Sequence, residues 1–267
     1  MKLTQDEISG QDWSCIRECV ISCGKYLLER RGERQEFEIM GTQVKARIDR
    51  EVENRILDCI SSMAEVNSFV SEENEESHSR YKRDRYWLID PIDGTSSYIN
   101  GYDGFVVQLC LMRDGEPSLA IIYAPALDQL YEACRDRGGY LNGHCIDSSR
   151  VNTYPRVVDN YPEPRGIAKY VVEQLPKCNY DECGSFGLKL CRVASKRSNI
   201  FVKDVIARTW DVGPGLLLNA ECGGITTDLE GNEISFVEGT VLEKGLLAGT
   251  DGNMHRKVMA LLSERSG

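Results

Sequence analysis

Two carboxylates stand three residues apart in Asp90-Pro91-Ile92-Asp93-Gly94-Thr95, directly after the apolar residues 86–89. The apolar run is typical of a buried strand, and the proline and glycine are turn formers. A turn at the end of a buried strand would bring the two carboxylates together, where one can bridge two cations and the other can bind one. Oxygen ligands select hard metals, so the motif predicts a magnesium-type site. A plain turn is the alternative interpretation.

The residues that follow, Gly94-Thr95-Ser96-Ser97, are typical of the opening turn of a helix. Such a turn offers free backbone N–H groups and the positive end of the helix dipole, which together bind phosphate. Gly94 would let the backbone approach an anion closely. We therefore expect Gly94 and Thr95 to contact a phosphorylated substrate beside the cations.

Two other acidic stretches are candidates for the same site. Ser71-Glu72-Glu73 precedes the strand, and Trp210-Asp211-Val212-Gly213-Pro214-Gly215 leads toward Glu221-Cys222-Gly223-Gly224. Taken alone, the first is typical of a solvated charge run and Asp211 of a helix N-cap. Carboxylates gathered without cations would repel one another and lose hydration, so a shared site implies bound metal ions.

The composition limits the kinds of partner. The chain has 267 residues and a formal net charge of −10, which repels nucleic-acid backbones, so polymeric nucleic acid is not an expected partner. Bound cations would reverse the local field and admit an anionic substrate. Neither a signal-peptide core nor an apolar run of about 20 residues is visible, so we expect a cytoplasmic protein away from the membrane.

The chain contains eleven cysteines and three histidines. An odd number of cysteines without a secretory context favours reduced thiols. Cys15, Cys19 and Cys23 recur every four residues along an apolar helix face, which favours core packing over a metal or redox role. The histidines are scattered, so a histidine-based zinc site is not expected.

The surrounding pattern predicts the elements that must position these side chains. Helices are expected over residues 12–31 and 49–64, with a connector over residues 30–40 and Asp49 near the start of the second helix. Residues 105–112 and 119–123 read as strands joined by a turn at residues 113–116. From about residue 146 strand-like and helix-like segments alternate. We therefore expect an N-terminal α+β half over residues 1–145 that carries most metal ligands, and a C-terminal α/β half over residues 146–267 that completes the site.

Together, the turn at residues 90–95, the Trp-Asp pair at residues 210–211 and the Glu-x-Gly-Gly at residues 221–224 resemble the signatures of the inositol monophosphatase family. The resemblance covers roughly residues 12–260. It implies an α/β fold, an α+β sandwich layered αβαβα, with two sheets and flanking helices. Ser71 and Pro214 depart from the family pattern, and Pro214 would change the first turn of its helix.

The resemblance also implies the roles of the site residues and the cofactor. The cofactor would be two or three Mg²⁺ ions, with Mn²⁺ as a possible substitute, and an activated water would attack phosphorus in line. Lithium should inhibit by replacing a weakly held magnesium ion. Calcium should also inhibit, because its larger and looser coordination suits the in-line geometry poorly. Glu72, Asp90 and the carbonyl of Ile92 would hold the first ion, and Asp90, Asp93 and Asp211 would hold the second. A weaker third ion would be held by Glu72. Asp49 and Thr95 would position and deprotonate the attacking water.

Substrate choice stays open between two branches of the family. Gly184 and Ser185 match a substrate loop in either branch. Asp204 stands where a glutamate binds ring hydroxyls in inositol phosphatases, whereas Lys189 favours the branch that must bind a second anionic group. Phe186 can stack on a base or belong to the core.

We therefore expect a magnesium-dependent phosphomonoesterase acting on a small phosphorylated metabolite, either inositol monophosphate or a related polyol or sugar phosphate. The alternatives are a 3′(2′),5′-bisphosphate nucleotidase acting on adenosine 3′,5′-bisphosphate and a catalytically silent, metal-binding member of the family. A homodimer is a further possibility that such families favour.

Overall fold

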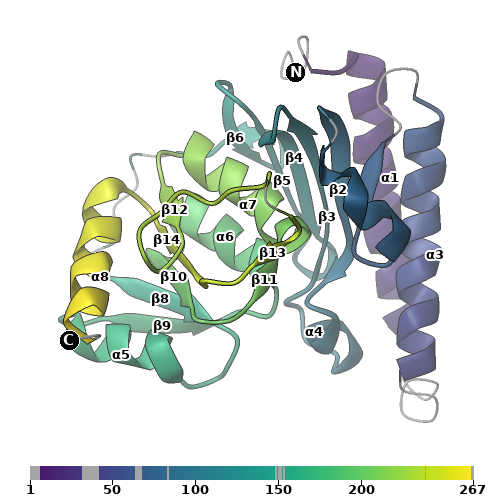
Figure 1. Ribbon diagram of the computed structural model, residues 1–267. Helices are drawn as coiled ribbons and strands as arrows, with labels where there is room; N and C mark the ends of the chain where they lie inside the picture. The colour runs from purple at the N-terminus through teal and green to yellow at the C-terminus, as the bar shows by residue number, and fades with distance from the viewer. Residues whose placement is uncertain are drawn as a thin grey trace.

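The computed structural model of the chain describes residues 7–31, 42–63, 68–82, 84–147, 149, 152, 154–237 and 239–265. Most of the connector expected over residues 30–40 lies outside these ranges. Figure 1 shows five layers: α1 and α3, a first sheet, α6 and α7, a second sheet, and α5 with α8. The αβαβα fold expected from the resemblance is confirmed.

The first sheet has seven strands in the order β1-β2-β3-β4-β5-β6-β7. Only β1 and β2 pair in parallel, and each later strand pairs antiparallel with its predecessor. The strands expected over residues 105–112 and 119–123 are confirmed as β3 and β4. The strands are β1 (Phe69–Ser71), β2 (Arg85–Asp93), β3 (Val106–Arg113), β4 (Glu116–Ala124), β5 (Gln129–Cys134), β6 (Gly138–Leu141) and β7 (His144–Cys145).

Strand β2 is apolar without a break over residues 86–89 because both of its faces are covered there. Trp87 and Ile89 pack into the core beneath α1 and α3, whereas Tyr86 and Leu88 pack on the opposite face with Trp210. The strand runs on through the two carboxylates, and its pairing with β3 shifts between Asp90 and Asp93. Three short helices lie between the strands: η1 (Glu75–Lys82) before β2, α4 (Thr95–Ile99) directly after β2, and η2 (Pro125–Leu127) after β4.

Helices α1 (Gly10–Arg31) and α3 (Thr42–Ser61) form the outer layer on the first sheet. The first matches the expected helix. The second begins seven residues before Asp49, so the expectation that Asp49 lies near its start is wrong. Residues 42–61 contain neither glycine nor proline, and nothing stops helix propagation upstream of Asp49.

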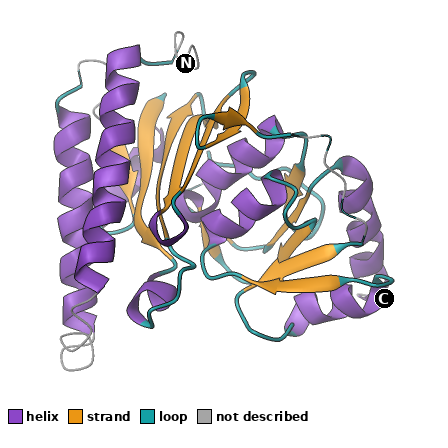
Figure 2. Cartoon of the chain, turned by 180° about the vertical axis from the view of Figure 1, so that it is seen from behind, coloured by secondary structure: helices purple, strands orange, loops and turns teal. Residues whose placement is uncertain are grey.

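The second sheet has the order β12-β14-β10-β8-β9, with α6 and α7 on the side of the first sheet and α5 and α8 on the other (Figure 2). Its strands and the small β11–β13 pair are β8 (Arg156–Asp159), β9 (Asn179–Glu182), β10 (Ile200–Lys203), β11 (Ala207–Arg208), β12 (Ile225–Thr227), β13 (Val241–Leu242) and β14 (Leu246–Gly249). The helices are α5 (Gly166–Gln174), α6 (Phe186–Ala194), α7 (Thr209–Glu221) and α8 (Gly252–Arg265).

Buried apolar side chains therefore form three main layers: one between the outer helices and the first sheet, one around α6 and α7 between the two sheets, and one between the second sheet and α5 with α8. A division of the chain at residue 145 stays a prediction. Among the described residues, the helices are all too short or too polar to cross a membrane.

Candidate active site

The turn that ends β2 is fixed by its own side chains. The backbone N–H of Ile92 donates to Asp90 Oδ1 at 3.1 Å, and the hydroxyl of Thr95 donates to the carbonyl of Ile92 at 3.0 Å. Gly94 has a φ of 85°, the left-handed conformation that glycine adopts without strain. The chain thus reverses within a few residues and leaves Asp90 and Asp93 buried side by side.

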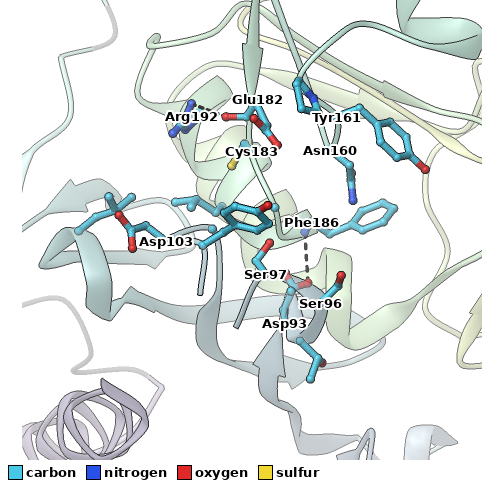
Figure 3. A pocket seen from close by; sticks show the side chains of 18 residues that line it. Asp93, Ser96, Ser97, Asp103, Asn160, Tyr161, Glu182, Cys183, Phe186 and Arg192 are labelled. Carbon is cyan, nitrogen blue, oxygen red and sulfur yellow. Dashed lines mark hydrogen bonds between the residues drawn. The ribbon is translucent and has the colours of Figure 1, made fainter. Parts of the chain in front are cut away.

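The carboxylate of Asp93 also contacts the start of α6. The N–H of Phe186 donates to Asp93 Oδ1 at 3.2 Å and that of Gly187 donates to Oδ2 at 2.6 Å. Figure 3 shows the first of these bonds linking the two halves of the site. Ser185 caps the same helix by accepting from the N–H of Leu188 at 2.9 Å. The negative charge therefore lies at the positive end of the helix dipole.

Asp211 enters from a third element. It is in the first turn of α7, where its Oδ2 accepts from the backbone N–H of Arg208 at 2.9 Å. The bond resembles a helix cap and fixes the side chain. Pro214 lies within α7, which continues past it to Glu221.

Gln108 is a residue of this site that sequence reasoning missed. It faces Asp90 across the β2–β3 ladder and is fully buried. Its Nε2 is 3.4 Å from both Asp90 Oδ2 and Asp93 Oδ2, and lies 3.1 Å and 3.3 Å from the backbone oxygens of Trp210 and Asp211. One amide group thus joins β2 to α7. The sequence feature that could have identified Gln108 is its polar side chain within the otherwise apolar strand expected over residues 105–112.

The three aspartates have raised pKa values. Burial is the main cause for Asp90, whose pKa lies well above the usual range, and the charges of Glu72, Asp93 and Asp211 raise it further. Burial also raises the pKa of Asp93 despite the N–H of Gly187, and raises that of Asp211 to about 8 with a contribution from Asp93. The nearby cations Lys189 and Arg208 offset the raised pKa values of Asp93 and Asp211 only in part.

Glu72 belongs to the same group. It is half-buried after β1, its N–H donates to the carbonyl of Ile89 at 3.2 Å, and its carboxyl group hydrogen-bonds that of Asp90. The oxygen donors fit Mg²⁺ or Mn²⁺, the ions that carboxylates prefer. In the part of the chain that the structure describes, no three His, Cys, Asp or Glu side chains are already spaced as a metal cage. Bonds to backbone amides hold the aspartates instead, as described above.

Asp49 and Glu53 lie one turn apart and are both buried in α3, the helix that packs on β2. Glu53 was missed at the sequence level, although its four-residue spacing from Asp49 places both on one helix face. Burial raises the pKa of Glu53, and a hydrogen bond with Ser71, the residue before Glu72, lowers it in part. The role of Asp49 toward a water stays a prediction.

A cavity of about 790 Å³ opens beside Asp93. Gly94, Thr95 and Gly184, which are predicted to bind substrate, line it, and Figure 3 shows Ser96, Ser97, Asn160, Tyr161 and Glu182 around it. Gly184 is required by close packing, because a Cβ there would lie 2.0 Å from Ser97 Oγ and 2.3 Å from the carbonyl of Gly104.

Three other residues predicted to bind substrate, Ser185, Lys189 and Asp204, do not line this cavity. Ser185 is buried, with its hydroxyl group capping α6, and its binding role stays a prediction. Lys189 is fully buried outside the cavity lining, and its Nζ donates to the carbonyl of Gly184 at 3.1 Å. It therefore supports this loop, and its role in substrate binding stays a prediction. Burial lowers its pKa to about 8. Asp204 is exposed beyond β10, also outside this lining, and its binding role stays a prediction. Phe186 lines the cavity and packs edge-on against Phe201.

The fold and the site together define a layered α/β sandwich protein whose acidic centre is assembled where the first sheet meets the middle helices. The model of the inositol monophosphatase family matches residues 14–266, and the chain belongs to this family.

Relatives and solved structures agree with this assignment. The fructose-1,6-bisphosphatase/inositol-1-monophosphatase of Thermotoga maritima is 30% identical over 222 residues, which cover 81% of each chain. Nus factor SuhB of Escherichia coli is 28% identical over 203 residues, 73% of this chain and 75% of its own. The crystal structure of inositol monophosphatase II from Staphylococcus aureus shows the same fold, with a TM-score of 0.78, 19% identity and coverage of 94% and 93% of the two chains.

Proposed function

We propose that this protein is a Mg²⁺-dependent phosphomonoesterase that hydrolyses a small phosphorylated metabolite, either inositol monophosphate or a related polyol or sugar phosphate. The observation that carries the proposal is the meeting of Glu72 after β1, Asp90 and Asp93 at the end of β2 and Asp211 in α7, with raised pKa values in the three aspartates. Such a group is stabilised by divalent cations.

In this proposal Glu72, Asp90, Asp93, Asp211 and the carbonyl of Ile92 hold two or three Mg²⁺ ions, for which Mn²⁺ can substitute. Bound ions would supply Lewis acidity and lower the pKa of water. Thr95 and Asp49 orient the attacking water and accept its proton. Gly94 and the backbone after it bind the phosphate, and Gln108 keeps Asp90 and Asp93 in place.

The charge of the cavity favours a polyol over a second phosphate. Asp93, Asp103 and Glu182 line it with carboxylates, whereas Arg192 is the one basic residue among the described lining residues. Carboxylates accept hydrogen bonds from hydroxyl groups and repel phosphate. Asp103 already pairs with Arg31 at 2.9 Å, so Glu182 is the better candidate to bind substrate hydroxyls.

A bisphosphate nucleotidase is the second candidate. Arg192 supports it, because this guanidinium could bind a second phosphate, and so do the aromatic side chains of Tyr161 and Phe186, which could contact a base. The resemblance to Nus factor SuhB keeps open the third candidate, a member of the family whose main role is not turnover. A cytoplasmic location, a homodimer and inhibition by lithium and calcium stay predictions.

A substrate panel tests these candidates. Inositol 1-phosphate, fructose 1,6-bisphosphate, histidinol phosphate and adenosine 3′,5′-bisphosphate are each offered with Mg²⁺, and phosphate release is measured for the wild type and Arg192→Ala. The polyol proposal expects cleavage of inositol 1-phosphate that Arg192→Ala leaves within a few fold. Cleavage of adenosine 3′,5′-bisphosphate alone, lost in Arg192→Ala, would support the nucleotidase, and no cleavage of any substrate would support the silent member.

A further inference from the structure

The helix pair α1 and α3, which lies side by side at one edge of the molecule in Figures 1 and 2, carries a group of thiols outside the acidic centre. Cys15 Sγ lies 3.0 Å from Cys59 Sγ. A disulfide bond is about 2.05 Å long, so the two sulfur atoms need to approach by only about 1 Å. The pair is therefore placed for a bond that is not present in the reduced protein.

Neighbouring contacts fix this approach along the two antiparallel helices. One turn further along α1, the thiol of Cys19 donates to the carbonyl of Arg55 at 3.5 Å. Beyond it, the hydroxyl of Tyr26 donates to Glu51, and the guanidinium of Arg55 lies 4.3 Å from the Tyr26 ring centre. These pairs keep one register, so bond formation requires side-chain rotation and no sliding of the helices.

The thiols differ in access, which revises the expectation that the trio on α1 packs in the core. Cys23 is buried as expected, but Cys19 is half-buried and Cys15 is exposed. Cys59 is half-buried directly beneath Cys15. A small oxidant therefore reaches Cys15 from solvent, and Cys59 is the neighbouring thiol that can complete the reaction.

We propose that Cys15 and Cys59 form a redox modification site, which closes to an intramolecular disulfide in the presence of a small disulfide such as oxidised glutathione. The Cys15 thiolate attacks one sulfur atom of the oxidant and releases one reduced glutathione. The Cys59 thiolate then attacks Cys15 Sγ, the bond to glutathione breaks, and a second reduced glutathione leaves. Two protein thiols are oxidised and one disulfide is reduced, so electrons and protons balance.

Disulfide formation at this site depends on the short distance between the two sulfur atoms and not on a low thiol pKa. Its hydrogen bond with Cys59 raises the pKa of Cys15 to about 11, so the reactive thiolate is scarce at neutral pH. The closing step is favoured because the second thiol is already in contact. The bond would join positions 44 residues apart, which restricts the unfolded chain and stabilises the native state.

The test uses the reduced full-length protein, incubated with oxidised glutathione at pH 8, alkylated and digested with trypsin. Cleavage after Arg17 separates Cys15 from Cys19, so mass spectrometry identifies the linked partner. We expect a Cys15–Cys59 peptide pair, the loss of two free thiols, and a Tm that rises by about 5 °C and returns on reduction.

Cys15→Ser and Cys59→Ser should each abolish the cross-link and the rise in Tm, whereas Cys178→Ser, a control in the C-terminal half, should retain both. Because Cys15 is exposed, Cys15→Ser should keep the Tm of the reduced wild type, which shows that the variant folds. A disulfide through Cys19, a glutathione adduct on Cys15 without ring closure, or an unchanged thiol count would each overturn the proposal.

Discussion

The side-chain amide of Gln108 reaches Asp93 across the first sheet, with its Nε2 3.4 Å from Asp93 Oδ2. Because the same nitrogen also contacts Asp90 and the backbone of the first turn of α7, the amide fixes the two carboxylates of β2 relative to each other and to the start of α7.

Gln108→Leu, which keeps the volume but removes the donor, should therefore weaken Mn²⁺ binding about 10-fold or more, as loss of a group that orients metal ligands usually does. Calorimetric titration of the metal-free protein measures this without reference to activity. Gln174→Leu, on the exposed side of α5, is the matched control and should bind as the wild type does. Equal affinities in the two variants would contradict the positioning role.

Asp93→Asn should separate activity from stability. Removing one buried negative charge relieves repulsion in the metal-free protein, but asparagine keeps only one of the two oxygens that accept the N–H groups of Phe186 and Gly187. These effects oppose each other, so the variant should stay folded. Turnover of the preferred substrate should drop by a factor on the order of 1,000, because the loss of one charge from a preorganised site is costly in the transition state. Near-normal turnover would refute the metal assignment, and Glu173→Gln on the exposed side of α5 controls for the loss of any carboxylate.

The stability of the metal-free protein should fall as pH rises. The pKa of Asp211 is raised to about 8 by burial, above its unfolded value of about 3.9, so the native state binds more protons than the unfolded state between these pH values. The stabilisation is complete below the unfolded pKa and is lost as pH rises through the folded pKa. Each such group contributes a slope of up to about 1.4 kcal/mol per pH unit.

Urea unfolding in chelator at several pH values between 5 and 8 measures this slope. Saturating Mg²⁺ should flatten it, because the ions favour the deprotonated carboxylates. If the free energy of unfolding in chelator rises between pH 5 and 8, the charges of the acidic centre are already neutralised without metal ions, and the prediction is wrong.

Gly184→Ala should destabilise the protein by roughly 1–3 kcal/mol, because the new methyl group would overlap the carbonyl of Gly104 and the hydroxyl of Ser97. Gly10→Ala is the matched control, since a Cβ at Gly10 has nothing within 4 Å, and should change stability by no more than about 0.5 kcal/mol. Chemical denaturation of both variants checks this. An equal change in the free energy of unfolding for the two variants would contradict the close contact of Gly184 with Gly104 and Ser97.

The sequence predicted the acidic turn because local signals coincide there, an apolar strand followed by a proline and a glycine. It did not predict the place of Asp49 in its helix, because α3 begins upstream without a local stop signal. Gln108 was missed for a different reason: its contacts depend on strand register and on the approach of α7, which act over long separations in the sequence. Lys189 was predicted to bind substrate because it resembles the family branch that binds a second anionic group. In the structure its amine is buried, 5.1 Å from the ring centres of both Phe186 and Phe201, and donates to the carbonyl of Gly184, an arrangement that depends on how α6 packs against the second sheet.

The chain order of the acidic residues has a consequence for biosynthesis. Asp90 and Asp93 are made early, but the amides of Phe186 and Gly187 that hold Asp93, and Asp211 itself, come from segments made much later. While the chain is still on the ribosome, the first sheet can form with two buried aspartates that have no completed partner. The growing polypeptide should therefore acquire its affinity for divalent ions only after α7 has emerged.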